Sequence, residues 1–201
     1  MQPPRPPSTR ERILRGAAEV VAASGLRGST VQDILHAASV SRRTFYQHFP
    51  STEGVMCDLY IEKMDELLET VTAASTAAGD DPLARLKGAV DAYLDFQQDG
   101  GVLLSRLQTE AVLLDSMLSP TRERALDRLV ALLSDEVGAH LPVRPDPLLL
   151  RGLLIGVEGV MIHLHRGENF PPERVEEARA VVHTMLLSGL SGAVTMAMQG
   201  R

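Results

Sequence analysis

The chain has 201 residues, of which 44% are hydrophobic and 3% aromatic, and it carries a net charge of −6. This length and composition suffice for one substantial core and favour helices over sheets, while the single cysteine, Cys57, excludes an internal disulfide and disfavours a thiolate metal site. The charge is unevenly distributed, because residues 1–50 hold seven arginines and three acidic residues, a local charge of +4. A basic N-terminal region on an acidic chain is compatible with phosphate binding.

The first eight residues are proline-rich and polar, so residues 1–8 are expected to form a flexible arm rather than a signal peptide. We therefore expect a cytoplasmic protein. Ser8 and Glu11 have the spacing of a capping box, and apolar residues then recur at helical intervals as far as Gly25. This pattern predicts a helix over residues 9–24.

Two short helices are expected between residues 29 and 49. Thr30 and Asp33 predict the start of a helix that runs to about Ala38, and Ser41 caps a third helix of about seven residues that ends before Pro50. The link between them is only three residues long. This spacing predicts a helix-turn-helix whose second helix enters the major groove of DNA.

The third helix has an inward and an outward side. Phe45 and Phe49 stand four residues apart, so both rings are expected to share an inward stripe with Ile34, Ala38 and Val40. The remaining side chains offer hydrogen bonds to bases and phosphates, and a solvated helix face beside an aromatic core is the alternative. The residues expected to contact DNA are Thr30, Ser41, Arg42, Arg43, Thr44, Tyr46, Gln47 and His48.

Six further helices are expected in the rest of the chain. Pro82, Pro120 and Pro147 each follow a capping residue and indicate the first turn of a helix. The expected helices lie near residues 52–78, 82–98, 101–116, 120–140, 147–166 and 172–196. The fold class is therefore all-α, with about nine helices: an N-terminal three-helix head followed by an antiparallel helical bundle.

The segment 147–166 is apolar almost all round, and we expect it to be buried on most sides. Arg151 and Glu158 inside a barely sufficient span argue against a membrane helix. Gly152, Gly156 and Gly159 would allow another helix to approach closely. The pattern favours a homodimer interface, and a buried central helix of a single chain is the alternative.

Residues 29–49 resemble the signature of the TetR family of transcriptional regulators. The matching residues are Val40, Ser41, Thr44, Tyr46, His48 and Phe49. The chain departs from the family at Ser39, where glycine is usual, at Phe45 in place of leucine and at Leu35-His36, where a small residue is common. The usual lysine near the fourth helix is also missing from the segment 50–54. The resemblance covers about residues 9–60.

The resemblance implies a helix-turn-helix DNA-binding domain over residues 9–54 and an effector-binding and dimerisation domain over residues 55–201. It implies a ligand-responsive repressor that acts as a homodimer on a near-palindromic operator in double-stranded DNA, with its last two helices forming a four-helix interface. An activator of the same fold is one alternative. A helical ligand-binding or adaptor protein with weakened DNA binding is another.

The implied effector is a small molecule, and polar groups within apolar helices mark candidate contacts. The candidate effector residues are Tyr93, Gln97, Gln108, Glu110, Glu158, Met161 and His163. Methionines that would line an adaptable, hydrophobic pocket are Met56, Met64, Met117, Met161 and Met185. No metal site is expected at His163 and His165, which point to different sides of a helix, and the sequence suggests no catalytic residue, cofactor or membrane partner.

Overall fold

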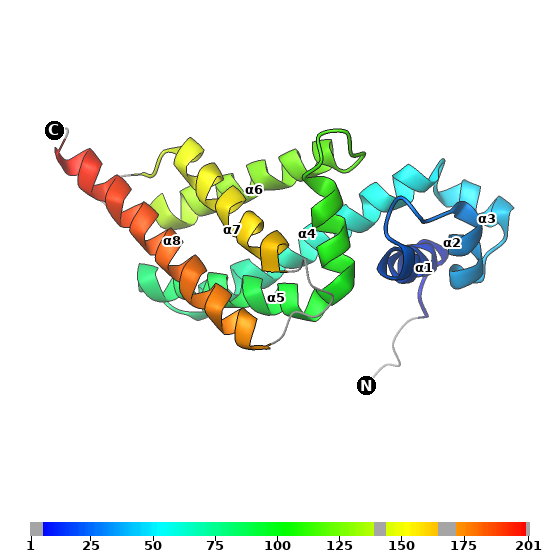
Figure 1. Cartoon of the computed structure of the whole chain (residues 1–201), viewed down its shortest axis with the longest axis horizontal. Helices are drawn as coiled ribbons and strands as arrows, with labels where there is room; N and C mark the ends of the chain where they lie inside the picture. Colours follow the sequence, from blue (N-terminus) through cyan, green and yellow to red (C-terminus); the bar gives the residue numbers. More distant parts are fainter. Residues whose placement is uncertain (1–5, 139–143, 165–171, 200–201) are drawn as a thin grey trace. The chain divides into compact units, whose positions relative to one another are not determined.

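A computed structural model describes residues 6–138, 144–164 and 172–199 of the chain. Within these residues it contains eight helices and no strand (Figure 1), which confirms the all-α fold. Residues 1–5 of the expected arm lie outside the described part. The chain divides into two compact units: Met1–Lys63 with Val102–Thr121, and Met64–Gly101 with Arg122–Arg201.

The first unit contains the three N-terminal helices that the capping pattern predicts. They are α1 (Thr9–Ser24), α2 (Val31–Ala38) and α3 (Arg42–His48). The capping boxes at Ser8 and Thr30 are both formed, so each helix start has its exposed backbone N–H groups satisfied by side chains. The boundaries predicted from the sequence are confirmed for all three helices.

A close approach of α1 to α2 fixes the geometry of this unit. A Cβ atom placed on Gly16 would lie 2.8 Å from the backbone nitrogen of Ala38, so only glycine fits there. Arg12 reaches from α1 to the end of α2, where its Nη2 atom donates hydrogen bonds to the carbonyl oxygens of Ala38 (2.9 Å) and Ser39 (2.7 Å). These carbonyls have no partner within α2, and the guanidinium satisfies them.

The turn between α2 and α3 has a left-handed residue at Ser39, with φ 51° and ψ 49°. Among the described residues, Ser39 is the one residue other than glycine with a positive φ. The Ser39 and Val40 N–H groups bond back to His36 and Leu35, which completes a tight helix end. Serine therefore takes the backbone conformation for which glycine is the usual residue.

The long middle helices differ in detail from the sequence-based expectation. Helix α4 spans Thr52–Ala77, close to the expected 52–78. Helix α5 (Pro82–Ala111) joins the two expected helices 82–98 and 101–116, with a break at Gly101, where φ is 47° and ψ is −133°. The expected end at 116 was wrong, because residues 112–118 form turns. The described residues form eight helices rather than about nine, because α5 joins two helices that the sequence predicts as separate.

The second unit contains the C-terminal helices. After α6 (Ser119–Gly138), helices α7 (Pro147–Leu164) and α8 (Pro172–Gln199) contact each other. The core joins α7 and α8 to the first half of α5; its buried members are Val90, Leu94, Val157, Met161, Ala178, Val182 and Leu186. This core leaves much of α7 uncovered.

The expectation that α7 is buried on most sides was wrong for the single chain. Only Leu150, Val157 and Met161 of this helix are buried, whereas Leu148 is 75% and Ile155 44% exposed. By length and composition α7 could cross a membrane, since its mean hydropathy is 1.6 over 18 residues. A helix that is apolar all round has more apolar surface than α5 and α8 cover within this chain.

We predict that Ser39→Gly stabilises the protein. Relief of the left-handed strain outweighs glycine's greater freedom in the unfolded chain, so the free energy of unfolding should rise by about 0.5–1 kcal/mol. Urea unfolding followed by circular dichroism measures the change. Ser39→Ala is the matched control, because alanine keeps a Cβ atom at this φ and should bring no gain. A less stable Ser39→Gly protein would show that Ser39 is not strained.

Candidate nucleic-acid interface

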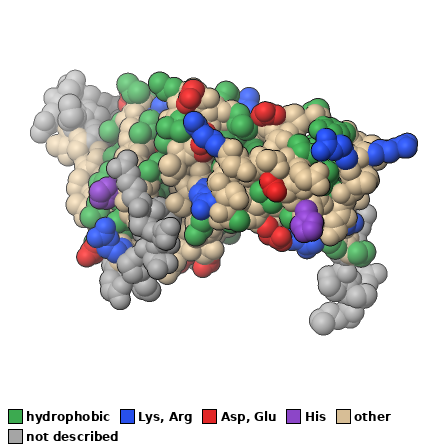
Figure 2. Space-filling model, turned by 45° about the vertical axis from the view of Figure 1, so that its right-hand side comes forward, with side chains coloured by type: hydrophobic (Ala, Val, Ile, Leu, Met, Phe, Trp, Pro, Cys, Tyr) green, Lys and Arg blue, Asp and Glu red, His purple; other side chains and the backbone are tan. Residues whose placement is uncertain are grey.

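The outward side of α3 is polar and exposed. Arg42, Arg43, Gln47 and His48 are exposed, and within the described part of the chain their side chains have no hydrogen-bond or ion-pair partner. The space-filling view shows Arg and His side chains projecting from the surface of the α1–α3 region (Figure 2). Their donors therefore remain available to bases and phosphates.

The inward side of α3 is aromatic and buried. Phe45 is 0% and Phe49 3% exposed, and their ring centroids lie 6.1 Å apart. Ile34 and Ala38 of α2 are also buried, as the helical spacing predicts, whereas Val40 is half-buried. Tyr46 meets Phe45 edge to face at 5.3 Å and stays 47% exposed, so its hydroxyl group can reach solvent or DNA.

Hydroxyl groups define the start of both helices of the motif. The Ser41 Oγ atom accepts a hydrogen bond from the Thr44 N–H group (3.1 Å) and lies 2.8 Å from the Thr44 Oγ1 atom. The Thr30 Oγ1 atom accepts from the Asp33 N–H group (3.3 Å) and donates to its carboxylate (2.6 Å). Ser41 and Thr30 are exposed and Thr44 is half-buried. The Ser41 and Thr30 hydroxyls therefore cap α3 and α2, and they fix the backbone where each helix begins.

The start of α4 lacks the lysine of the family pattern, and the structure shows what stands there instead. The Ser51 Oγ atom accepts a hydrogen bond from the Gly54 N–H group at 3.2 Å. Hydrogen bonds from the Glu53 backbone and from Ser51 lower the pKa of the Glu53 carboxyl group. A negative charge at this helix start is stabilised by the helix dipole, but it adds no attraction for phosphate.

Arg10 is a further basic residue beside α3, and the sequence pattern did not single it out. Its guanidinium carbon lies 5.6 Å from the centre of the Phe49 ring, and its Nη2 atom lies 2.7 Å from the Asp58 carboxylate. Asp58 is 48 residues away in sequence, so no local spacing could reveal this contact. Arg10 ties α1 to the end of α3 and to α4.

The candidate effector residues fall in both units. Gln108 and Glu110 lie in the first unit, where Gln108 is buried and Glu110 pairs with Arg27 at 3.2 Å. The other five lie in the second unit. Met161 is part of its core and Tyr93 packs against it, whereas His163 is exposed. Gln97 is fully buried.

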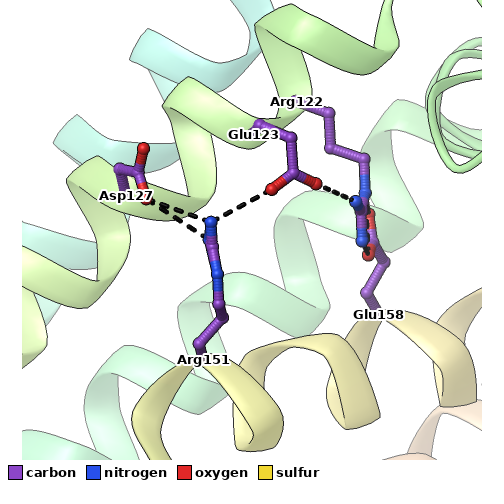
Figure 3. A network of polar contacts seen from close by, with 5 residues as sticks. All are labelled: Arg122, Glu123, Asp127, Arg151 and Glu158. Carbon is purple, nitrogen blue, oxygen red and sulfur yellow. Dashed lines mark hydrogen bonds and ion pairs between the residues drawn. The ribbon is translucent and has the colours of Figure 1, made fainter. Parts of the chain in front are cut away.

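Glu158, the remaining candidate, belongs to an ion-pair network between α6 and α7 (Figure 3). Its carboxylate accepts hydrogen bonds from Arg122, including one from Nε at 2.9 Å, and the two side chains are only 13% and 12% exposed. Arg151 of α7 lies 3.0 Å from both Glu123 and Asp127 of α6. Both charged residues of the apolar helix α7 are thus neutralised by α6, which argues against a membrane location for this helix.

Comparison with known proteins shows what the N-terminal region is similar to. Residues 13–57, which include the whole helix-turn-helix, match the family model described as bacterial regulatory proteins, tetR family. This N-terminal region is therefore similar to the TetR family of regulators. Among curated relatives, it is 32% identical over 127 residues to the HTH-type transcriptional regulator TcmR of Streptomyces glaucescens, a match that covers 63% of this chain and 51% of TcmR. It is 29% identical over 101 residues to the HTH-type transcriptional repressor DhaR of a Mycobacterium species, covering 50% of this chain and 51% of DhaR.

The matched region thus spans about half the length of these two curated relatives. The likeness to solved structures extends further. The fatty acid degradation regulator FadR of Bacillus halodurans superimposes with a TM-score of 0.73 at 20% identity, covering 93% of this chain and 98% of FadR. At this identity the comparison shows a shared fold, from the helix-turn-helix to the last helices.

Proposed function

We propose that this protein is a DNA-binding transcriptional repressor of the cytoplasm, which acts as a homodimer on a near-palindromic operator and responds to a small-molecule effector. One observation carries the proposal: one side of α3 is exposed and the other is anchored by Phe45. The exposed side chains, which have no hydrogen-bond or ion-pair partner among the described residues, are Arg42, Arg43, Gln47 and His48. Arginine is suited to paired hydrogen bonds with guanine O6 and N7. Tyr46 and His48 are suited to phosphates, which position the duplex.

Repression is favoured over activation by the curated relative DhaR, which is named a repressor. A helical adaptor without DNA binding is the second candidate, because Ser39 and the missing lysine depart from the family pattern. The geometry argues for the regulator. Ser39 takes the left-handed conformation that the turn requires. The side chains of Arg42, Arg43, Gln47 and His48 form no hydrogen bond or ion pair with any residue that the structure describes.

A dimer interface on α7 and α8 is supported by exposed stripes at helical spacing. On α7 the exposed Leu148, Gly152, Ile155 and Gly159 recur every three or four residues. A Cβ atom added to Gly152 or Gly159 would meet nothing within 4 Å in the single chain. On α8 the exposed stripe includes Val181, Thr184, Leu187, Ser188, Ser191 and Gly192. Apolar and small residues on two neighbouring helices suit the close packing of a four-helix interface.

Effector response requires coupling between DNA binding and the effector-binding region, which we place within residues 55–201. The chain passes between the two compact units at three points: within α4 after Lys63, at the Gly101 break of α5, and near the start of α6 after Thr121. We propose that effector binding shifts α4 and so changes the separation of the two α3 helices in the dimer. The coupling is reciprocal, so operator DNA should weaken effector binding by the same factor.

Replacement of both Arg42 and Arg43 by alanine should abolish specific DNA binding. Each lost pair of base contacts removes roughly 1–3 kcal/mol of discrimination, so the affinity for a selected operator should fall by at least about 30-fold. Fluorescence anisotropy at fixed salt, with operator and random duplexes, measures the change. The control combines Arg124→Ala with Arg174→Ala, two exposed arginines of the second unit that remove the same charge.

The control separates base recognition from a general loss of positive charge. The regulator is supported if only the Arg42 and Arg43 substitutions remove the preference for operator. Equal binding by both variants would favour the adaptor instead.

Replacement of Ile155 by arginine should dissociate the dimer. Ile155 is 44% exposed in the single chain and lies at the centre of the α7 stripe, so a charge there would be buried without a partner at the interface. Sedimentation at micromolar concentration should show the mass of a dimer for the unchanged protein and of a monomer for Ile155→Arg. Leu114→Arg, at a leucine that is 97% exposed in the first unit, is the control and should stay dimeric. If the protein without a substitution is a monomer at this concentration, the proposed dimer is wrong.

A further inference from the structure

Gln97 stands out among the polar side chains of the second unit. It is 0% exposed, and neither its Oε1 nor its Nε2 atom has a hydrogen-bond partner within the described residues. A buried amide without partners is costly, because the groups lose their hydrogen bonds to water and gain none in return. Such an amide in a folded protein calls for an explanation by function.

The position of Gln97 on α5 places it at the end of the apolar core. Val90 and Leu94 belong to this core, and Tyr93 packs against it. Leu94 lies three residues before Gln97, Tyr93 four and Val90 seven, so all three share the helix face of Gln97. Gln97 therefore continues a hydrophobic stripe. An apolar side chain at this position would destabilise the folded protein less than an amide without hydrogen bonds. The next residue, Gln98, is exposed. Only one of the two neighbouring glutamines carries the unsatisfied amide.

The chemistry of a primary amide limits what can satisfy it. Oε1 accepts and Nε2 donates, and the two atoms lie side by side in one plane. Both are satisfied together by a group that presents an N–H donor and a C=O acceptor on one edge. A lactam, a cyclic imide or a similar ring has this edge, because the ring holds its amide in the cis form.

The charges of the second unit indicate a neutral ligand. Two of its largely buried arginines already pair with carboxylates: Arg122 with Glu158, and Arg179 with Asp91 at 2.7 Å and Asp95 at 2.8 Å. An ionised ligand at this core would therefore bury a charge, and the neutral amide of Gln97 supplies no opposite charge to pair with it. An apolar ring beside the core adds hydrophobic contact area.

We propose that Gln97 binds the effector of this protein, and that the effector is a neutral, largely apolar molecule with a cis-amide edge of the lactam or imide type. Gln97 donates from Nε2 to the ligand carbonyl and accepts at Oε1 from the ligand N–H group. This assignment rests on the proposed effector response, and it adds the chemical class of the ligand.

Calorimetric titration of the full chain with three probes tests the assignment. The probes are the bicyclic lactam dihydroquinolinone, its N-methyl derivative, which lacks the donor, and the hydrocarbon tetralin. The lactam should bind at least about tenfold more tightly than the N-methyl derivative, because that derivative leaves Oε1 unpartnered. Gln97→Met should remove this preference and still bind tetralin, whereas Gln98→Met should keep it.

The same variants give a test without ligand. Gln97→Met removes an unsatisfied amide from the core, so the thermal midpoint of the free protein should rise by about 2–6 °C, and Gln98→Met should leave it unchanged. Gln97→Leu, which has a different shape, repeats the test should methionine not fit. A fall in midpoint for both Gln97 variants would show that the amide is satisfied in the free protein and would overturn the assignment.

The binding outcomes separate this assignment from the proposed function. Failure of the lactam to bind at millimolar concentration, equal affinity for lactam and N-methyl derivative, or a preference that persists in Gln97→Met each overturns the ligand class. If the protein still binds its operator in such an experiment, the proposal that it is a DNA-binding regulator is unaffected. Conversely, the protein could show the predicted preference for the lactam and bind no DNA duplex. That result would support the Gln97 site and contradict the DNA-binding proposal.

Discussion

The burial of Phe45 and Phe49 determines whether this protein can read DNA. Helix α3 has seven residues, and a helix of that length is not stable alone in water. Its orientation comes from the two rings packed against the head, with Phe45 wholly removed from solvent. Fixing one side of so short a helix also fixes the other, so Arg42, Arg43 and Gln47 point outward as a consequence of the same packing.

The supports of α3 act at its two ends. Ser41 and its contact with Thr44 define the first turn, while Arg10 stacks on Phe49 at the last. Behind α3, the glycine at position 16 lets α1 and α2 approach closely, and Arg12 closes the end of α2. In the second unit, pairing of Arg122 with Glu158 allows the apolar helix α7 to carry charge next to its core. Gln97, by contrast, is a buried amide of the second unit whose oxygen and nitrogen both lack a hydrogen-bond partner within the described residues.

The sequence predicted the parts of the fold that depend on local chemistry. Capping side chains at Ser8, Thr30 and Ser41 define the starts of the first three helices, and prolines in the first turn define the starts of α5, α6 and α7, so these starts were confirmed. The Gly101 break could not be distinguished from a gap between helices, because glycine favours both. Contacts that join distant segments, such as Arg10 with Asp58 and Arg122 with Glu158, have no local signal. The burial of α7 was overestimated because composition alone does not say which molecule covers an apolar surface.

Methylation interference on an operator selected from random DNA tests most directly whether α3 reads the major groove. Methylation of guanine N7 blocks the atom to which Arg42 or Arg43 would donate. We expect methylation to prevent binding at two clusters of guanines that are related by the symmetry of the site. The two clusters should be separated by about one turn of the DNA helix, roughly 10 base pairs, or by a multiple of it. Binding that is insensitive to N7 methylation throughout the site would contradict this expectation.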